Sequence, residues 1–303
     1  MDAGSTKTIG VLMGENGIDW PKKKIAGPGS FYYDFNAAVS NVAKVVGQLI
    51  RDKDDVECIC LAGAGLSVSK LSNRAQRSLE NLFPVKAVLC VSDAVAAALG
   101  AADGKPSVVL VLGTGSACYG FDGNRFYRAG GWGWIFGDEG SGYRLGQSFL
   151  TRLLGEVDGR YNELFVNSSL FARLRSKSSL RSFGERILLT YNRKDKIASL
   201  APEVIKLAKT GVPEALEILE REALSTLPLI KAVFRKVGVA EEKVYLTGGL
   251  TNNRFYMTLI RKTLVEKGVL DVRIVRNASL RGTNVVFRAY KRGEDLKRFK
   301  AWT

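Results

Sequence analysis

Three glycine-rich turns in the sequence have residue types that suit binding of phosphate. They read Asp2-Ala3-Gly4-Ser5-Thr6-Lys7-Thr8, Leu112-Gly113-Thr114-Gly115-Ser116 and Leu246-Thr247-Gly248-Gly249-Leu250. Glycine lets backbone N–H groups approach phosphate oxygens closely, and serine and threonine hydroxyls add further donors. None of the turns has the G-x-x-x-x-G-K-[ST] or G-x-G-x-x-G spacing of other nucleotide-binding loops. One such turn alone is commonly a plain turn, but the three together at expected strand ends predict a nucleotide-phosphate site.

Two aspartates have positions that suit chemistry on a phosphate. Asp93 follows the apolar segment Val85–Val91, where it could accept the proton of a nucleophilic hydroxyl, the one base that phosphoryl transfer asks for. The chain has no histidine, so acid–base chemistry falls to Asp, Glu, Lys, Tyr or Cys. Alternatively, Asp93 only caps the helix that follows it. Asp2 could hold a hydrated Mg²⁺, because this ion keeps most of its water ligands in proteins.

The bulk composition narrows the class of protein. A chain of 303 residues predicts about two domains, and 46% hydrophobic with 25% charged residues is ordinary for a globular protein. No apolar run approaches the roughly 18 residues of a membrane span, and the N-terminus lacks the features of a signal peptide. We therefore expect a cytoplasmic protein with no membrane partner. Its four cysteines lack C-x-x-C spacing, so we expect small buried side chains.

The net charge of +15 admits three explanations. A basic chain can bind nucleic acid, can attract an anionic substrate such as ATP, or can have the charged surface of heat-adapted proteins. The basic residues cluster only at Lys22–Lys24 and from Lys291 to Lys300, and no aromatic residues are interleaved with them in a basic motif. This pattern favours ATP over nucleic acid.

The periodicity of apolar residues predicts an α/β fold in which strands alternate with helices. In the first half we expect helices at Phe35–Arg51, Asn73–Leu82 and Ala94–Ala102, and strands at Thr8–Met13, Asn16–Ala26, Val56–Leu61 and Val85–Val91. After a linker at Asp103–Pro106 we expect strands at Val108–Leu112, Ala117–Phe121, Arg125–Ala129, Val244–Thr247 and Val272–Val275. Residues 141–236 are expected to be largely helical, with further helices at Asn253–Lys267 and Leu280–Lys291.

The three turns in this order resemble the phosphate-1, phosphate-2 and adenosine motifs of the actin–hexokinase–Hsp70 superfamily. Within it the chain is similar to the N-acetylglucosamine kinase group, classed with the BadF/BadG/BcrA/BcrD ATPases, which includes glucosamine kinases and some archaeal hexokinases. Two further segments carry the resemblance, Val91-Ser92-Asp93-Ala94 and Gly130-Gly131-Trp132-Gly133 followed by Gly137-Asp138-Glu139-Gly140-Ser141. The resemblance covers essentially the whole chain.

This resemblance implies an ATP-dependent sugar kinase that uses Mg²⁺ and phosphorylates a hydroxyl of a hexosamine or hexose. It also implies two ribonuclease-H-like (actin-like ATPase) domains with a cleft between them. We expect the first at residues 1–104, joined by the C-terminal helix 280–303, and the second at residues 105–279 with a helical insertion. Sugar binding should close the cleft and exclude water, since an open site would hydrolyse ATP.

The resemblance assigns a role to individual residues. Asp93 would be the general base and Asp2 would hold the metal through water. The residues expected to bind ATP are Gly4, Ser5, Thr6, Lys7, Gly113, Thr114, Gly115, Thr247, Gly248, Gly249 and Asn253. Those expected to bind the sugar are Ser30, Gly63, Asp93, Ser116, Trp132, Asp138 and Glu139. The alternatives are that Asp138–Ser141 is a capped helix start and that Lys7 is a solvated surface lysine.

Two departures from the family pattern bear on these roles. Asp2 directly follows Met1, so the first strand is almost absent, and we expect the natural chain to begin a few residues earlier. The family's G-P-x-N segment reads Gly27-Pro28-Gly29-Ser30 here, which leaves Ser30 as the nearest polar substitute for the asparagine. The acceptor therefore stays open among N-acetylglucosamine, glucosamine and glucose.

Three alternative functions follow from the same features. One is a regulatory ATPase whose nucleotide state controls a partner. A second is an activator with an iron–sulfur cluster, although Cys58, Cys60, Cys90 and Cys118 do not lie where that branch of the superfamily has its ligands. The third is a nucleic-acid-binding protein on a kinase scaffold, which steep salt dependence of binding would reveal. The sequence leaves the oligomeric state open, with a homodimer as one possibility.

Overall fold

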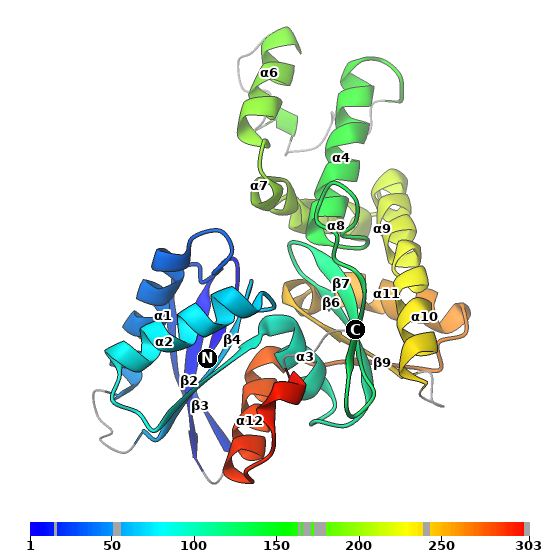
Figure 1. Cartoon of the computed structure of the whole chain (residues 1–303). Coiled ribbons are helices and arrows are strands. Elements are labelled where there is room, and N and C mark those ends of the chain that lie inside the picture. The colour runs from blue at the N-terminus through cyan, green and yellow to red at the C-terminus, as the bar shows by residue number, and fades with distance from the viewer. Residues whose placement is uncertain are drawn as a thin grey trace.

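The computed structural model describes residues 1–14, 17–50, 56–162, 165, 171–172, 180–238 and 243–299. The described strands form two mixed five-stranded sheets, in the orders β3-β2-β1-β4-β5 and β10-β9-β6-β7-β8, with helices packed on them (Figure 1). The expectation of an α/β fold is therefore confirmed. In the described part of the chain, no helix is both long and apolar enough to cross a membrane.

The first sheet is built around a very short central strand. Its strands are β1 (Asp2–Ala3), β2 (Thr8–Gly14), β3 (Gly17–Ala26), β4 (Cys58–Gly63) and β5 (Ala87–Ser92), and its helices include α1 (Phe35–Ile50) and α2 (Ser69–Leu82). β1 pairs with β2 antiparallel and with β4 parallel, with Asp2 opposite Ile9 and Ala62. Two neighbours thus hold Asp2 in the sheet although β1 has only two residues.

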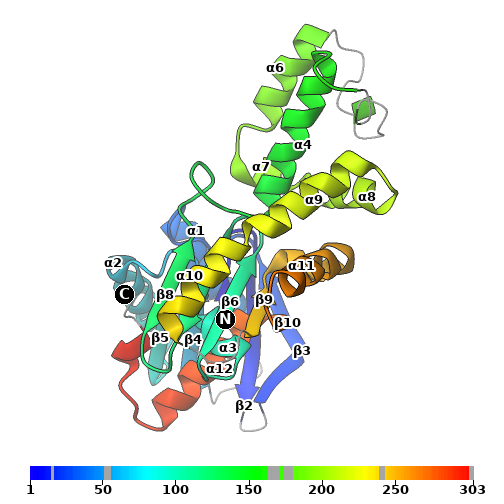
Figure 2. The same ribbon diagram turned by 90° about the vertical axis from the view of Figure 1, so that its right-hand side faces the viewer.

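The second sheet contains the other two glycine turns at its strand ends. Its strands are β6 (Ser107–Leu112), β7 (Ser116–Phe121), β8 (Phe126–Gly130), β9 (Lys243–Thr247) and β10 (Asp271–Ile274). β6 pairs antiparallel with β7 and parallel with β9. Helix α10 (Leu227–Val237) covers one face of β6, β7 and β8 (Figure 2). The turn η1 (Gly249–Asn252) and the helix α11 (Arg254–Glu266) follow β9.

A helical segment is inserted between β8 and β9, as expected. It contains α4 (Gly142–Val157), α6 (Leu180–Thr190), α7 (Lys194–Ala198), α8 (Ala201–Lys209) and α9 (Pro213–Ser225). The outer ends of α4 and α6 extend away from both sheets at the top of Figure 1. Helices α4, α7, α8 and α9 pack against one another, so the base of the insertion is fixed close to the second sheet.

Two helices cross at the centre of the molecule. α3 (Asp93–Ala101) and α12 (Ala278–Lys291) are in close contact, and 3-10 helix η2 (Leu296–Phe299) follows α12 (Figure 1). Their apolar cluster includes Ala62 and Val91 of the first sheet and Val109 and Phe121 of the second. This is the packing that a returning C-terminal helix needs. The domain boundaries themselves remain a prediction, and residues 300–303 lie outside the described part.

Most expected elements lie within a few residues of the observed ones. The strand expected at Val56–Leu61 is instead Cys58–Gly63, because its pairing with β5 continues through Gly63. The helix expected from Asn73 begins at Ser69, because Val68 precedes it without a side-chain cap that could mark the start. The ends expected at Asn16 and Arg51 lie outside the described residues.

None of the four cysteines, all of which lie in the described part of the chain, forms a disulfide, and three of them are buried. Cys58 and Cys60 lie on one face of β4, with their sulfur atoms 3.7 Å apart. Burial raises the pKa of the Cys118 thiol well above its usual range. These observations agree with the expectation of small core side chains.

Candidate active site

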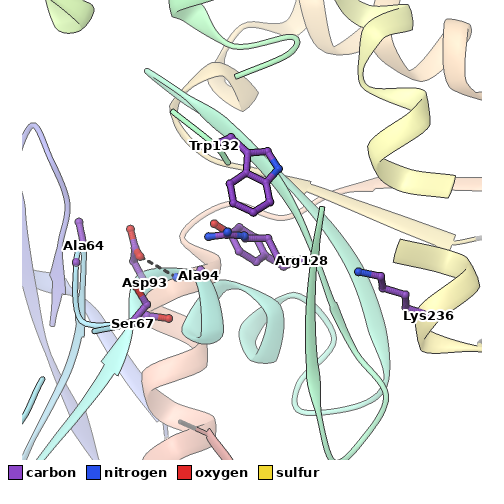
Figure 3. A pocket seen from close by; sticks show the side chains of 10 residues that line it. Ala64, Ser67, Asp93, Ala94, Arg128, Trp132 and Lys236 are labelled. Carbon is purple, nitrogen blue, oxygen red and sulfur yellow. Dashed lines mark hydrogen bonds between the residues drawn. The ribbon is translucent and has the colours of Figure 1, made fainter. Parts of the chain in front are cut away.

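A cavity of about 530 Å³ lies between the two sheets. The loop after β4, the start of α3, the strands β7 and β8 and the helix α10 all contribute to it (Figure 3). Its lining residues are Ala64, Gly65, Ser67, Ser92, Asp93, Ala94, Tyr119, Arg128, Trp132 and Lys236. The cavity therefore joins two of the expected sugar residues, Asp93 and Trp132, which lie far apart in the sequence.

Asp93 is the first residue of helix α3. Ser92 is the N-cap residue, and its hydroxyl accepts a hydrogen bond from the Val95 N–H at 3.1 Å. The Asp93 carboxylate accepts the neighbouring Ala94 N–H at 2.9 Å. Because Ser92 caps the helix, Asp93 is not needed for that purpose. Burial raises the pKa of Asp93, and the Ala94 N–H partly offsets this effect.

Asp2 lies close enough to Asp93 for their charges to interact. Burial, and then the charge of Asp93, raises the pKa of Asp2 to about 6, while the N-terminal ammonium group and Lys7 lower it. A carboxyl group whose ionised form is disfavoured by burial and by a second carboxylate gains from a nearby cation. The described residues contain no group of three or more metal-ligating side chains. A single carboxylate such as that of Asp2 could hold Mg²⁺ through water, because this ion keeps most of its water ligands in proteins.

The first glycine turn is tight and open to solvent. The Gly4 N–H donates to the Lys7 carbonyl at 3.0 Å, and Ser5, Thr6 and Lys7 are exposed. The Gly29 N–H donates to the Gly4 carbonyl at 2.8 Å, which ties the Gly27–Ser30 segment to the turn. The side chains of the turn are thus available to a ligand.

The second and third glycine turns adjoin each other. They follow the parallel neighbours β6 and β9, in which Val111 lies opposite Thr247. Gly248 has a φ of 104°, and a Cβ at this position would lie 2.3 Å from the Leu112 carbonyl oxygen. Only glycine fits there. Asn253 caps α11 by accepting the Tyr256 N–H at 3.1 Å, so its side chain has a structural role in addition to the expected contact with ATP.

The start of α4 supports the second turn from behind. The N–H groups of Gly142 and Tyr143 donate to the carbonyls of Gly113 and Thr114, at 2.9 and 3.2 Å. Ser141 caps α4 by accepting the Arg144 N–H. The alternative interpretation of this segment, a capped helix start, is therefore correct for Ser141. Asp138 has other partners.

Asp138 lies behind the second turn and not among the residues that line the cavity. It is only 3% exposed and has a φ of 66°. One carboxylate oxygen accepts the Ser116 N–H at 3.1 Å, and the other is 2.6 Å from the Lys194 ammonium. The Ser116 hydroxyl donates to the Glu139 carbonyl at 2.6 Å. Asp138, Glu139 and Ser116 are thus brought together, one layer away from Asp93 and Trp132.

The neighbouring Glu139 differs from Asp138 in its contacts. Its buried oxygen Oε2 has no hydrogen-bond partner in the described part of the structure. The same oxygen would lie 3.5 Å from a Cβ on Gly137 and 3.6 Å from one on Gly130. It therefore faces the glycine segment that carries Trp132. A buried acceptor without a donor is costly unless a ligand or water supplies one.

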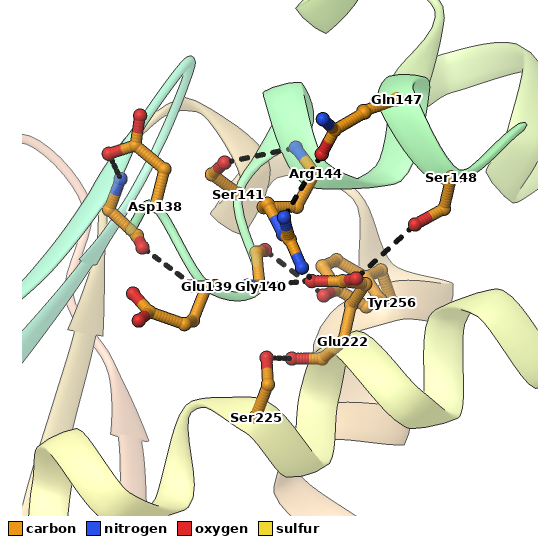
Figure 4. Close-up of polar contacts among 11 residues, drawn as sticks. Asp138, Glu139, Gly140, Ser141, Arg144, Gln147, Ser148, Glu222, Ser225 and Tyr256 are labelled. Carbon is orange, nitrogen blue, oxygen red and sulfur yellow. Dashed lines mark hydrogen bonds and ion pairs between the residues drawn. The ribbon is translucent and has the colours of Figure 1, made fainter. Parts of the chain in front are cut away.

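A buried polar network holds the Asp138–Ser141 turn in place (Figure 4). Glu222 of α9 accepts from the Gly140 N–H and from the Ser148 hydroxyl, each at 3.3 Å. The Tyr256 hydroxyl of α11 donates to the Gly140 carbonyl at 3.0 Å. The turn is therefore connected to the insertion and to the helix that follows the third glycine turn.

Ser30 and Gly63 do not line the cavity. Ser30 is buried, and the Phe31 N–H donates to the Ala64 carbonyl at 3.0 Å. A Cβ at Gly63 would meet Leu66 and Phe31. These two residues lie behind the Ala64–Gly65 side of the cavity, and their expected contact with a sugar remains a prediction.

Sequence reasoning missed several basic and aromatic residues of the site. Trp132 is 68% exposed, and the Arg128 guanidinium lies 4.8 Å from its ring centre. Tyr119 and Lys236 also line the cavity. The charge of Asp93 adds to burial in raising the pKa of Tyr119. Arg128 could have been noticed, since it lies two residues before the Gly130–Gly133 segment, but Lys236 has no comparable signal.

Comparison with known proteins shows the family of this chain. The model of the BadF/BadG/BcrA/BcrD ATPase family matches residues 1–282. The chain belongs to this family. The N-acetylmuramic acid/N-acetylglucosamine kinase of Clostridium acetobutylicum is 30% identical over 217 residues, which cover 70% of each chain. The N-acetyl-D-glucosamine kinase of Dictyostelium discoideum is 28% identical over 290 residues, with 88% of this chain and 89% of the relative covered.

A solved structure agrees with this membership at the level of fold. It is a protein of Porphyromonas gingivalis with a provisional N-acetylglucosamine kinase assignment, and its TM-score is 0.76 at 19% identity. The comparison covers 95% of this chain and 98% of the other. The expected family and the α/β fold are thus confirmed, as is the expectation of an ATP-dependent carbohydrate kinase.

Proposed function

We propose that this member of the family transfers the γ-phosphate of ATP to a hydroxyl of a hexosamine or hexose, with Asp93 as the general base. The observation that carries the proposal is the cavity that the half-buried Asp93 and the exposed ring of Trp132 line together. A carboxylate of raised pKa binds a proton more readily than an ordinary aspartate. An aromatic ring offers an apolar wall to a sugar.

The ATP phosphates are proposed to bind the three glycine turns. The second and third turns adjoin, and the N–H groups of α4 already occupy the carbonyls of Gly113 and Thr114. The first turn offers the exposed side chains of Ser5, Thr6 and Lys7. Asp2 would hold Mg²⁺ through water, and the bound ion would neutralise charge on the phosphates. The high positive charge of the chain suits the same anionic ligand.

The sugar hydroxyls are proposed to contact Glu139 and Asp138. Glu139 offers a buried oxygen that lacks a donor, so a hydroxyl there would satisfy it. An ionised carboxylate has about four acceptor sites, so Asp138 can accept a hydroxyl besides its present partners. The names of the two relatives favour an N-acetylated hexosamine, whereas Ser30 in place of the family's asparagine keeps glucosamine and glucose as candidates.

The remaining expectations about partners belong to the same proposal. The proposed reaction needs ATP, Mg²⁺ and a sugar, and we place it in the cytoplasm because ATP is the phosphate donor. A homodimer, and the expectation that nucleic acid is not a partner, stay predictions.

A panel of hexoses and hexosamines in a coupled ADP-release assay tests the proposal. We expect at least one sugar to raise ADP release well above the rate with ATP and Mg²⁺ alone. The sugar with the highest kcat/KM identifies the acceptor. If every sugar leaves the rate at its basal level, the proposed function is wrong, and the regulatory ATPase alternative gains support.

A further inference from the structure

The second glycine turn has no positive charge of its own. Residues 106–124 contain no lysine or arginine. Phosphoryl transfer depends on neutralising the negative charge of the phosphates, for which kinases commonly use a lysine or arginine as well as the metal. A cation for this turn must therefore come from another part of the chain.

Lys194, the first residue of α7, reaches the turn from the helical insertion. Its ammonium is 2.6 Å from Asp138 Oδ2, and Asp138 Oδ1 accepts the Ser116 N–H. A Cβ at Gly115 would lie 2.5 Å from Lys194 Nζ. The ammonium therefore packs directly over the backbone of the turn, and the absence of a side chain at Gly115 makes room for it.

The backbone that carries Lys194 is held firmly. Helices α4 and α7 cross so closely that a Cβ at Gly146 would lie 2.0 Å from the Ile197 carbonyl oxygen. A Cβ at Gly142 would lie 3.4 Å from the Ala198 carbonyl oxygen. Because α4 also donates its first N–H groups to the turn, the same helix positions the turn and the lysine.

Lys194 has donors left for a ligand. An ammonium group has three N–H donors, and Asp138 can take one of them. The Lys194 side chain is 24% exposed, whereas that of Asp138 is 4% exposed, so the lysine is the partner open to solvent. It lies on the side of the turn occupied by Asp138 and Glu139, the residues proposed to face the sugar. A phosphate bound there would be the one transferred.

We propose that Lys194 is a ligand of the terminal phosphate of ATP and that Asp138 holds its ammonium in position. This inference rests on the proposed function, because it assumes that the Gly113–Gly115 turn binds the nucleotide. It adds a role for the helical insertion, which supplies a charge to the phosphate site in addition to covering the sheet. Lys7 and Lys194 would then act on the phosphates from the first and the second turn.

Binding of ATP and ADP to the Lys194→Met variant, measured by calorimetry with Mg²⁺ and without sugar, tests the inference. We expect the affinity for ATP to fall roughly 10- to 100-fold, the effect of losing a hydrogen bond to a charged group, and the affinity for ADP to fall less. Lys194→Arg should restore most of the ATP affinity. Lys196→Met, an exposed lysine on the same helix, is the matched control and should bind ATP normally.

An unchanged ATP affinity together with a raised KM for sugar would overturn the inference and leave Lys194 as a support for Asp138. Lys194→Met leaves the Asp138 carboxylate buried and unpaired, which destabilises the fold. If this variant does not fold, the double variant with Asp138→Asn carries the same expectation for ATP. Since binding is measured without turnover, a chain that bound ATP through Lys194 but phosphorylated no sugar would refute the proposed function alone.

Discussion

At the scale of single residues, Asp93 combines burial with freedom from a structural duty. Ser92 supplies the helix cap, and the Asp93 carboxylate accepts the backbone N–H groups of Ala94 and of Asp93 itself. Its raised pKa has burial as the main cause. Removing its charge should therefore affect the reaction much more than the fold.

We expect Asp93→Asn to lower sugar-dependent turnover by about 10²–10⁴-fold, the usual contribution of a general base, while ATP binding and the melting temperature change little. Asp103→Asn, an exposed aspartate just beyond the other end of the same helix, is the matched control and should keep normal turnover. Near-normal turnover in Asp93→Asn would exclude Asp93 as the base.

The raised pKa of Asp93 also sets a pH dependence. The base must be ionised to accept a proton, so activity falls as pH drops through its pKa. Because burial raises that pKa, the acid limb of kcat/KM should lie at higher pH than for an ordinary aspartate, whose pKa is about 3.9. A profile of kcat/KM against pH measures the limb. A limb at or below that ordinary value would contradict a base whose pKa is raised.

Sequence reasoning located residues whose neighbours in the chain form a motif. Asp93, Asp138 and the glycine turns each stand next to a strand end or within a glycine-rich segment, where local pattern is informative. Lys194 lies in the charged run Arg193-Lys194-Asp195-Lys196, and its contact with Asp138 spans the helical insertion. Such a contact is a consequence of tertiary packing, so no local pattern could have predicted it.

At the scale of elements, the crossing of α3 and α12 joins the two sheets. A Cβ at Gly282 would lie 1.8 Å from the Ala96 carbonyl oxygen, and one at Gly100 would lie 2.0 Å from the Ala278 carbonyl oxygen. These contacts are with backbone, which cannot move aside cheaply. The sequence predicted both helices, but it gave no sign that two glycines would set their distance.

We expect Gly282→Ala to lower the free energy of unfolding by about 1–3 kcal/mol through overpacking, although alanine favours a helix by about 1 kcal/mol over glycine. The matched control is Gly184→Ala in α6, where a Cβ would meet nothing within 4 Å. That variant should be as stable as the parent or slightly more so. Denaturant unfolding of both variants measures the difference, and equal stability would contradict the close crossing.

At the scale of the whole molecule, the two sheets bring different parts of the reaction to one cavity. The chain that leaves the first sheet contributes Asp93, and the chain that leaves β8 of the second contributes Trp132; both residues line the cavity. The alternation of strands and helices made the α/β class predictable, because apolar periodicity is a local property. The depth of the cavity, and the position of Asp138 behind it, depend on how the sheets pack and were not predictable from the sequence.

The balance of phosphate during turnover tests the central claim most directly. With the best sugar of the panel, ³¹P NMR and mass spectrometry of the products should show one sugar phosphate formed for each ATP consumed, with little inorganic phosphate. This is the result of transfer from ATP to a sugar hydroxyl in a site that excludes water. ATP consumption that yields inorganic phosphate and no sugar phosphate would contradict a sugar kinase and indicate a regulatory ATPase.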